Sequence, residues 1–281
     1  LVFAVGMWNY KDPIVKERFF GLTNQQGNHG EDVKELYYYL DNTPTHSYMK
    51  MLYKYPQQLF PYQWLINENA NRSKQLPEFE LMDTGIFDNN EYFDVFIEYA
   101  KADKDDILIK ITVCNRAAHN ASLKLFPTLW FRNTWSWGSD NYKPRMKATN
   151  GYIEIEHKNL KVTRCHISQP SPALFCDNET NTKVLYQVSS FNLFYKDGIN
   201  DFIIRGNEDA VNSLQTGTKA AFVVDLSIEA NDSAIVCLRL WNESQTDPFQ
   251  DFEATFEKRK AEADEFYSEM ETGITSEDAR L

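Results

Sequence analysis

The middle of the chain alternates between apolar and polar residues with a period of two, which is typical of β-strands. Residues 92–99, 107–113 and 121–131 each keep one apolar face, and polar turns separate them, so they predict an antiparallel meander. Further strands are expected near residues 151–156, 159–167 and 183–189, and as a pair over 219–229 and 233–241. Because each strand has one apolar face, the pattern predicts a mainly β fold, a large sandwich of antiparallel sheets.

Two segments before this region have the appearance of short helices. Residues 45–55 and 61–74 predict such helices, and Pro56 and Pro61 interrupt them. Proline ends a helix because it lacks the backbone N–H that a helix interior requires. The sandwich is therefore expected to carry short helices between its strands.

A longer helix is predicted over residues 247–273. Asp247 would be its N-cap, Pro248 its first residue and Gly273 its C-cap. Such a helix would be roughly 37 Å long, and after a sandwich it more often connects to a further domain than covers a site. Its apolar face is formed by Phe249, Phe252, Phe256, Ala263, Phe266 and Met270.

The composition narrows the range of partners. The net charge is −12, from 41 acidic and 29 basic residues, and the basic residues form no dense patch. Because such a surface repels a phosphate backbone, nucleic acid is not an expected partner. No apolar run approaches the roughly 20 residues that cross a bilayer, and the first residues do not resemble a signal peptide. We therefore expect no membrane partner.

Cysteine usage indicates the compartment. The chain has four cysteines, none of them in a CxxC pair, which argues against a structural zinc site. Each cysteine lies in a strand-like context, and together they predict buried thiols in a reducing compartment, the cytoplasm. The four residues are Cys114, Cys165, Cys176 and Cys237.

The segment from Phe19 to Glu35 is rich in glycines, side-chain amides and carboxylates, and it has neither a helical nor a strand period. The aromatic residues of segment 48–56 follow shortly after it. Planar amides, carboxylates and aromatic faces bind sugars through directional hydrogen bonds and stacking. The segment therefore predicts a sugar-contacting loop, and the alternative is an ordered loop that only ties two sheets together.

A second cluster of aromatic residues follows the strand at 121–131. In an extended conformation Trp135 and Trp137 lie on the same face. Together with Trp130 and Phe131 they could form a platform for stacking of a pyranose ring. The alternative is that these tryptophans belong to the sandwich core or anchor a domain interface.

Other chemical motifs are rejected. Asp83-Thr84-Gly85 matches the tripeptide of aspartic proteases, but Ile86 follows it and no second copy exists, so Asp83 is interpreted as a turn residue. His29, Glu31 and Asp32 could suggest a metal site. However, the histidines lack the i, i+4 pairing of zinc proteases, and the carboxylates lack the order of a calcium loop. No metal or other cofactor is therefore expected.

Four motifs look like those of the bacterial glucosidases of glycoside hydrolase family 63, a family that also includes mannosyl-oligosaccharide glucosidase. They occur in the order of the family and extend over nearly the whole chain. The motifs are KERFFGLTNQQGNHGEDVKELYYYLDNTPTHSYMKMLYKYPQ (residues 16–57), LMDTGIFDNNEYFDVFIEYAKA (81–102), LFPTLWFRNTWSWG (125–138) and EADEFY (262–267).

The resemblance implies an inverting glycosidase with an N-terminal antiparallel β super-sandwich followed by an (α/α)6 barrel. Inversion needs an acid and a base carboxyl about 6.5–9.5 Å apart, and in the family both belong to the barrel. We therefore expect residues 1–246 to form the sandwich domain and residues 247–281 a helical linker toward a barrel that lies outside this chain. No catalytic residue is assigned, and the 281 residues alone are expected to be inactive.

The resemblance also implies that loop 21–48 faces the barrel and helps to close its sugar pocket. The expected partners are an oligosaccharide substrate and the C-terminal barrel of the same polypeptide. The alternative is a stand-alone carbohydrate-binding or scaffolding module without catalysis. The residues predicted to contact substrate or the domain interface are Asn28, His29, Glu31, Asp32, Lys34, Trp135 and Trp137, with Lys34 paired to a nearby carboxylate.

Overall fold

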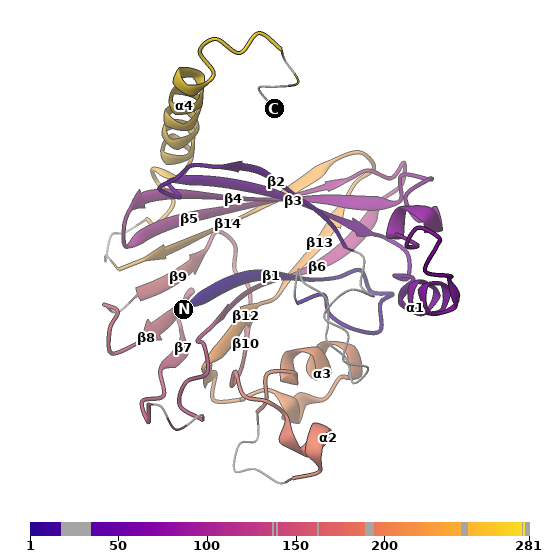
Figure 1. Cartoon of the computed structure of the whole chain (residues 1–281). Helices are drawn as coiled ribbons and strands as arrows, with labels where there is room; N and C mark the ends of the chain where they lie inside the picture. Colours follow the sequence, from indigo (N-terminus) through magenta and orange to yellow (C-terminus); the bar gives the residue numbers. More distant parts are fainter. Residues whose placement is uncertain are drawn as a thin grey trace.

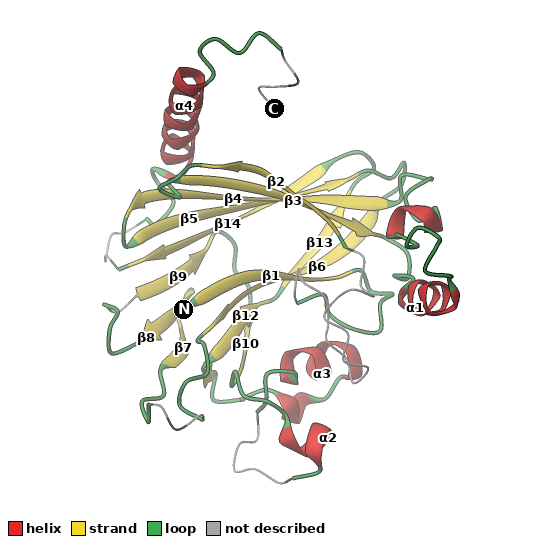
Figure 2. Ribbon diagram, viewed as in Figure 1, coloured by secondary structure: helices red, strands yellow, loops and turns green. Residues whose placement is uncertain are grey.

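Two antiparallel sheets lie face to face in the computed structural model (Figures 1 and 2). It describes residues 1–17, 35–136, 138, 140–161, 163–188, 194–242, 247–276 and 278. The smaller sheet has the order β1-β6-β12-β10, and β13 also pairs with β6. Its strands are β1 (Val2–Trp8), β6 (Ala121–Trp130), β10 (Ala173–Cys176), β12 (Lys219–Phe222) and β13 (Val224–Ile228).

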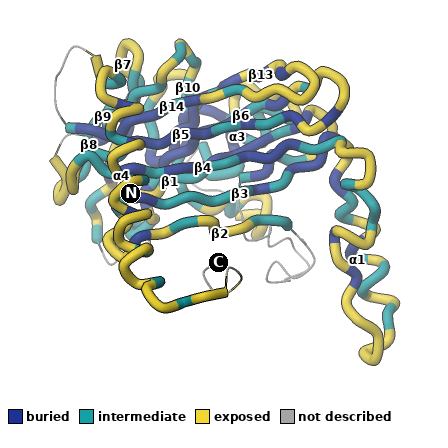
Figure 3. The backbone as a smooth tube through the Cα atoms, turned by 90° about the horizontal axis from the view of Figure 1, so that it is seen from above, coloured by how far each residue is buried: buried dark blue, intermediate teal, exposed yellow. Residues whose placement is uncertain are grey.

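The larger sheet has the order β11-β7-β8-β9-β14-β5-β4-β3-β2. Figure 3 shows buried strands along its middle and a more exposed β2 at its edge. Its strands are β2 (Leu36–Asn42), β3 (Tyr48–Pro56), β4 (Tyr92–Asp103), β5 (Asp106–Asn115), β7 (Arg145–Thr149), β8 (Tyr152–Glu156), β9 (Thr163–Ile167), β11 (Thr216–Gly217) and β14 (Ser233–Trp241).

The main core lies between the two sheets. Val95 and Ile111 of the larger sheet pack in one cluster with Leu125 and Val224 of the smaller sheet. All four side chains are essentially fully buried, and each such residue contributes roughly 1.5–3 kcal/mol through removal of its surface from water. The prediction of a mainly β fold with packed antiparallel sheets is therefore confirmed.

The predicted pairing of strands is wrong in two places. β4 and β5 do form a hairpin, but β6 leaves the predicted meander and pairs with β1, β12 and β13 in the opposite sheet. Likewise, residues 219–229 and 233–241 do not pair, because β14 lies between β5 and β9 of the larger sheet. Alternation indicates which face of a strand is buried but not which strand lies beside it.

Asn115 lies where the chain passes from β5 of the larger sheet to β6 of the smaller sheet. It ends β5, and its side-chain amide donates hydrogen bonds to the carbonyls of His119, Ile228 and Glu229 at 2.8, 3.2 and 3.0 Å. These bonds join the end of β5 to the start of β6 and the end of β13. A fully buried amide with these partners holds the chain where it changes sheets.

Of the two short helices predicted from the sequence, one is confirmed and one is wrong. Helix α1 (Tyr62–Asn71) confirms the segment 61–74, whereas 45–55 is largely β3. There Tyr53 and Tyr55 face the sandwich interior, and pairing on both edges of β3 prevails over local preference. Residues 183–188, the described part of the strand predicted over 183–189, do not form a strand either. They overlap α2 (Thr182–Tyr186), whose first turn is capped by Asn181 through the Val184 N–H.

The remaining short helices are α3 (Gly198–Arg205) and two 3₁₀ turns over Leu81–Thr84 and Glu208–Ala210. The first of these turns contains Asp83 and ends at Gly85, which has a positive φ of 68°. Asp83 therefore is a turn residue, as predicted. None of the helices in the described part of the chain combines the length and the apolar character that crossing a bilayer requires.

The C-terminal helix α4 (Phe252–Met270) is shorter than predicted and stands on the outer face of the larger sheet (Figure 1). Asp247 does not cap it. The Asp247 side chain accepts a hydrogen bond from the N–H of Phe249, and the helix begins after Asp251. Phe252, Phe256 and Ala263 pack on Tyr48, Ala100 and Leu108, but Phe266 and Met270 at the far end are 40% and 66% exposed.

Candidate functional site

Six of the seven predicted site residues lie outside the described residues. They are Asn28, His29, Glu31, Asp32, Lys34 and Trp137. The seventh, Trp135, follows β6 and is half-buried against the main core. Its indole Nε1–H donates to Glu179 Oε1 at 2.8 Å. Trp135 thus combines the packing of a core residue with a polar contact at the surface.

Lys16, Glu17 and Glu35 border residues 18–34, the part of the predicted sugar-contacting loop that lies outside the described residues, and each takes part in an ion pair. Lys16 Nζ lies 2.9 Å from Oε1 of Glu35, the last residue of the predicted segment. The two side chains are only 3% and 2% exposed. The Lys16 ammonium also lies 3.7 Å from the centre of the Phe60 ring and 4.7 Å from that of Tyr62, as in cation–π contacts. The pair therefore brings together the described residues on the two sides of residues 18–34.

Burial dominates the electrostatics of this pair. It lowers the pKa of Lys16 and raises the pKa of Glu35, while the opposite charge of each partner acts against the shift. The two groups are therefore mutually dependent, because either charge alone would be left in an apolar environment.

Asp12 fixes the backbone beside this pair. Its Oδ2 accepts the hydroxyl of Tyr55 at 2.5 Å, and its Oδ1 accepts the N–H of Phe60 at 2.7 Å. Burial raises the pKa of Asp12, and the hydrogen bond from Tyr55 acts in the opposite direction. The turn that leads into Lys16 is thereby tied to the end of β3 and to the Phe60 region.

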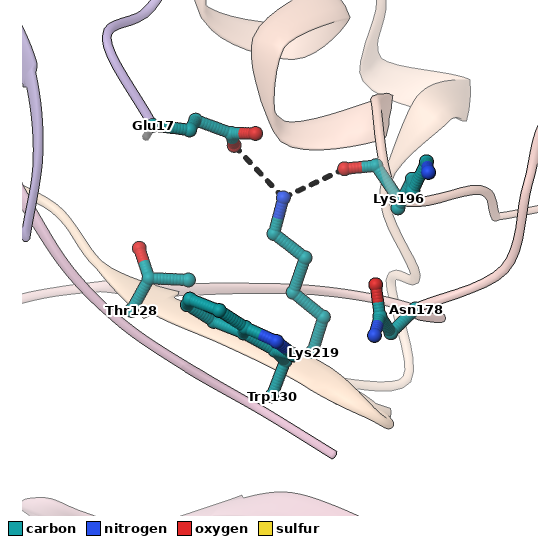
Figure 4. A pocket seen from close by; sticks show the side chains of 6 residues that line it. All are labelled: Glu17, Thr128, Trp130, Asn178, Lys196 and Lys219. Carbon is teal, nitrogen blue, oxygen red and sulfur yellow. Dashed lines mark hydrogen bonds and ion pairs between the residues drawn. The ribbon is translucent and has the colours of Figure 1, made fainter. Parts of the chain in front are cut away.

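Glu17, which follows Lys16 in the chain, pairs with Lys219 of β12. Figure 4 shows the Lys219 ammonium between the Glu17 carboxylate, at 2.8 Å, and the backbone carbonyl of Lys196, at 2.7 Å. Lys219 is 6% exposed although it carries a charge. Together with Thr128, Trp130 and Asn178, these residues line a cavity of about 200 Å³ on the outer face of the smaller sheet.

A third group of charges surrounds Trp135. Lys143 Nζ lies 2.8 Å from Asp177 Oδ2 and 2.9 Å from Glu179 Oε1. Asp177 Oδ1 in turn accepts the backbone N–H of Thr218 at 3.1 Å. The residues after β10 therefore divide their contacts: Asn178 faces the Lys219 cavity, while Asp177 and Glu179 hold Lys143 and Trp135.

The described residues contain no group of three or more His, Cys, Asp or Glu side chains placed to hold a metal ion. The four cysteines are free thiols and all lie in strands, as predicted. Cys165 and Cys176 are buried, and Cys114 and Cys237 are half-buried. Burial raises the pKa of Cys176 to about 12 and that of Cys237 to about 11, so these thiols are poor nucleophiles.

Sequence reasoning missed the ion pairs on either side of the loop. Lys219 begins the otherwise apolar stretch Lys219-Ala220-Ala221-Phe222, and a charge in such a strand indicates a buried partner. This signal identifies Lys219 as unusual but does not identify Glu17, because the two are far apart in the chain. Only the fold brings them together.

The sequence of this chain is similar to one part of a longer protein. It is 37% identical over 314 residues to the uncharacterized protein YMR196W of Saccharomyces cerevisiae, and the match covers 94% of this chain. The chain spans only 29% of the length of that relative. No family model matches the sequence.

Three of the solved structures that match part of this chain have the names of carbohydrate-active enzymes. A protein described as a kojibiose phosphorylase from the human microbiome matches with a TM-score of 0.31 and 11% identity over 62% of this chain and 19% of that one. A polysaccharide lyase gives 0.37 and 10% over 73% and 23%, and heparinase III gives 0.29 and 10% over 74% and 22%. Likeness at these scores carries no argument about function.

Proposed function

We propose that this chain is the N-terminal sandwich domain of an inverting α-glucosidase of glycoside hydrolase family 63, active on oligosaccharides in the cytoplasm. In this proposal the sandwich supports a C-terminal (α/α)6 barrel and helps to close its sugar pocket. The four sequence motifs support the assignment to the family. The length of the yeast relative is consistent with a chain that corresponds to one part of a larger protein.

The observation that carries the proposal is the anchoring of the loop predicted to contact sugar. Lys16–Glu35 joins the residues on either side of the loop, and Glu17–Lys219 ties its start to β12. Buried ion pairs cost desolvation, so they are weak as sources of stability and best understood as specifying one arrangement. In the proposal, the polar side chains between these two anchored ends contact the sugar.

Helix α4 supports the presence of a partner domain. Its first half is packed on the larger sheet, whereas Phe266 and Met270 remain exposed at its far end. Apolar side chains that project together from a surface commonly mark an interface. In the proposal this end of α4 contacts the barrel.

Alanine substitution of Asn28, His29 or Asp32 in the natural gene product tests the proposal. We expect each change to raise KM or lower kcat for α-glucoside hydrolysis about tenfold or more, because misplacing substrate contacts affects the transition state. Thermal unfolding should be unchanged. Asn71→Ala, at an exposed position of α1, is the matched control. Unchanged kinetics in all three variants would refute the assignment.

The second candidate is a carbohydrate-binding or scaffolding module without catalysis. Tyr38 and Tyr39 favour it, because they are 45% and 71% exposed on the edge strand β2 and could stack on sugars. Assays on the natural gene product distinguish the two candidates. Oligosaccharide binding without hydrolysis would support the module, and glucose release would support the glucosidase.

A further inference from the structure

The cavity beside Lys219 has the composition of a small binding site. Its floor is the outer face of the smaller sheet, where Thr128 and Trp130 project from β6 and Lys219 from the neighbouring β12. Asn178 closes one side, and Glu17 and the Lys196 carbonyl lie across from the floor (Figure 4). Residues from five separate parts of the chain therefore converge on a space of about 200 Å³.

The charges in the cavity favour a neutral ligand. The Lys219 ammonium is already compensated by the Glu17 carboxylate at 2.8 Å and the Lys196 carbonyl at 2.7 Å. A phosphate or carboxylate that approached Lys219 would meet the negative charge of Glu17. A cation would have to compete with Lys219 for the same carboxylate.

The polar groups are held in place, and they include both donors and acceptors. The Asn178 side-chain nitrogen donates to the Phe131 carbonyl at 2.8 Å, which fixes the plane of the amide. The Thr128 hydroxyl donates to the Phe126 carbonyl at 2.7 Å, so its oxygen retains its lone pairs as acceptors. A ligand rich in hydroxyl groups can both donate to and accept from such a set.

Trp130 supplies the apolar surface. It is half-buried at the end of β6, directly opposite Lys219 in the ladder, and it lines the cavity. An indole ring at the edge of a polar cavity can stack on the C–H face of a sugar ring. Sites for drug-sized ligands occupy roughly 300–1,000 Å³, so this smaller cavity suits a single ring.

We propose that this cavity binds one neutral pyranose unit, with Trp130 stacked on the ring and Glu17, Lys219 and Asn178 bonded to its hydroxyl groups. None of the residues that line the cavity is among the contacts predicted within residues 28–34, and binding of one sugar there requires no catalytic domain. The inference therefore does not depend on the proposed hydrolysis. A ligand of this size with a handful of hydrogen bonds has millimolar affinity.

Titration with methyl α-D-glucopyranoside tests the site. The chain has six tryptophans, and their indole N–H signals can be resolved by NMR in the natural gene product and assigned by substitution. We expect the Trp130 signal to shift and to saturate at millimolar sugar. Trp130→Ala should weaken binding at least tenfold, as measured from the sugar signals by saturation transfer. Trp64→Ala, which changes a tryptophan that is 50% exposed on α1, should leave binding unchanged.

Three results would overturn the inference. One is a Trp130 signal that does not move in the wild-type protein, a readout that is independent of whether Trp130→Ala folds. Another is a shift caused by inorganic phosphate at lower concentration than by the sugar, which would identify an anion site. The third is equal weakening of binding in Trp64→Ala. Loss of hydrolysis in the Asn28, His29 or Asp32 variants would leave this test unaffected.

Discussion

The two outer faces of the sandwich bury charged residues in different ways. On the larger sheet, α4 provides the cover and its acidic residues pair with the strands. Lys110 Nζ lies 2.6 Å from Glu253 of α4, and Arg239 binds Asp251, which directly precedes α4, at 2.6 Å. Arg239 also binds Asp106 of the neighbouring strand β5 at 2.6 Å. An apolar cluster centred on Phe252 and Phe256 fills the rest of this interface.

On the smaller sheet, the described residues provide only a partial cover. Helix α3 packs through Ile199 on Phe126 and Val15, but beside this cluster lies the cavity of Lys219. Here the carboxylate comes from Glu17, at the start of the predicted sugar-contacting loop rather than on a helix. A helix that brings both acids and phenylalanines makes a closed interface. On the smaller sheet, Glu17 brings the acid without such an apolar cover from the described residues, and a space remains among them in which a ligand can bind.

The largest expected effect on stability concerns the outer face of the larger sheet, which α4 covers. Phe256→Ala should destabilise the protein by about 3–5 kcal/mol, because it removes a fully buried ring from the base of α4. Urea unfolding measures the loss. Phe266→Ala on the same helix is the control and should change stability by less than about 0.5 kcal/mol, since this ring is 40% exposed. Equal losses in both variants would show that the two ends of α4 do not differ.

An intermediate effect on stability is expected at the Lys16–Glu35 ion pair. Lys16→Met should destabilise by roughly 3 kcal/mol, because it leaves the carboxyl of Glu35 buried without its partner. The double variant Lys16→Met/Glu35→Leu should recover most of the loss, since an apolar pair of similar size needs no compensation. Urea unfolding at pH 7 compares the three proteins. A double variant as unstable as the single one would show that the ion pair is not the cause.

The smallest expected effect is a dependence of stability on pH that arises from His166 of β9, in the larger sheet. Burial lowers the pKa of His166, and the charges of Arg164 and Arg239 add to this shift. The unfolded chain therefore binds a proton near pH 6.5 that the folded chain binds only at lower pH. Stability should consequently fall as the pH drops below about 6.5, by less than about 1 kcal/mol for a half-exposed group that solvent screens.

His166→Gln should flatten this dependence in urea unfolding between pH 8 and pH 5. The slope should decrease without disappearing, because burial also lowers the pKa of His157. His46→Gln, at an exposed turn, is the control. An unchanged slope in His166→Gln together with a flattened one in His46→Gln would contradict the assignment.

The sequence predicted the type of fold better than its connections. Alternation placed Val95, Ile111 and Leu125 in the core correctly, because burial of one strand face is a local property. It could not show that β6 crosses to the opposite sheet, since that depends on Asn115 reaching residues more than a hundred positions later. The helix over 45–55 was predicted wrongly for the same reason: pairing with β2 and β4 decides the state of β3.

For the candidate site too, the sequence indicated local features but not the contacts between distant parts of the chain. Composition singled out a polar loop and Trp135, which the structure places at the surface of the core. The buried partners of the residues beside that loop could not be read from the sequence, because Lys219 reaches Glu17 across most of the chain. The contacts of Asn28, His29, Glu31, Asp32, Lys34 and Trp137 remain predictions.

The position of β6 at the centre of the smaller sheet has a consequence for synthesis of the protein. The hairpins of β3, β4 and β5 can form as soon as they leave the ribosome, but β6 also needs β12 and β13, which are made much later. At 5–20 residues per second this interval is on the order of ten seconds. During it the apolar face of β6 has only β1 as a sheet partner. The nascent chain is therefore most prone to aggregation, and most dependent on chaperones, between these two stages of elongation.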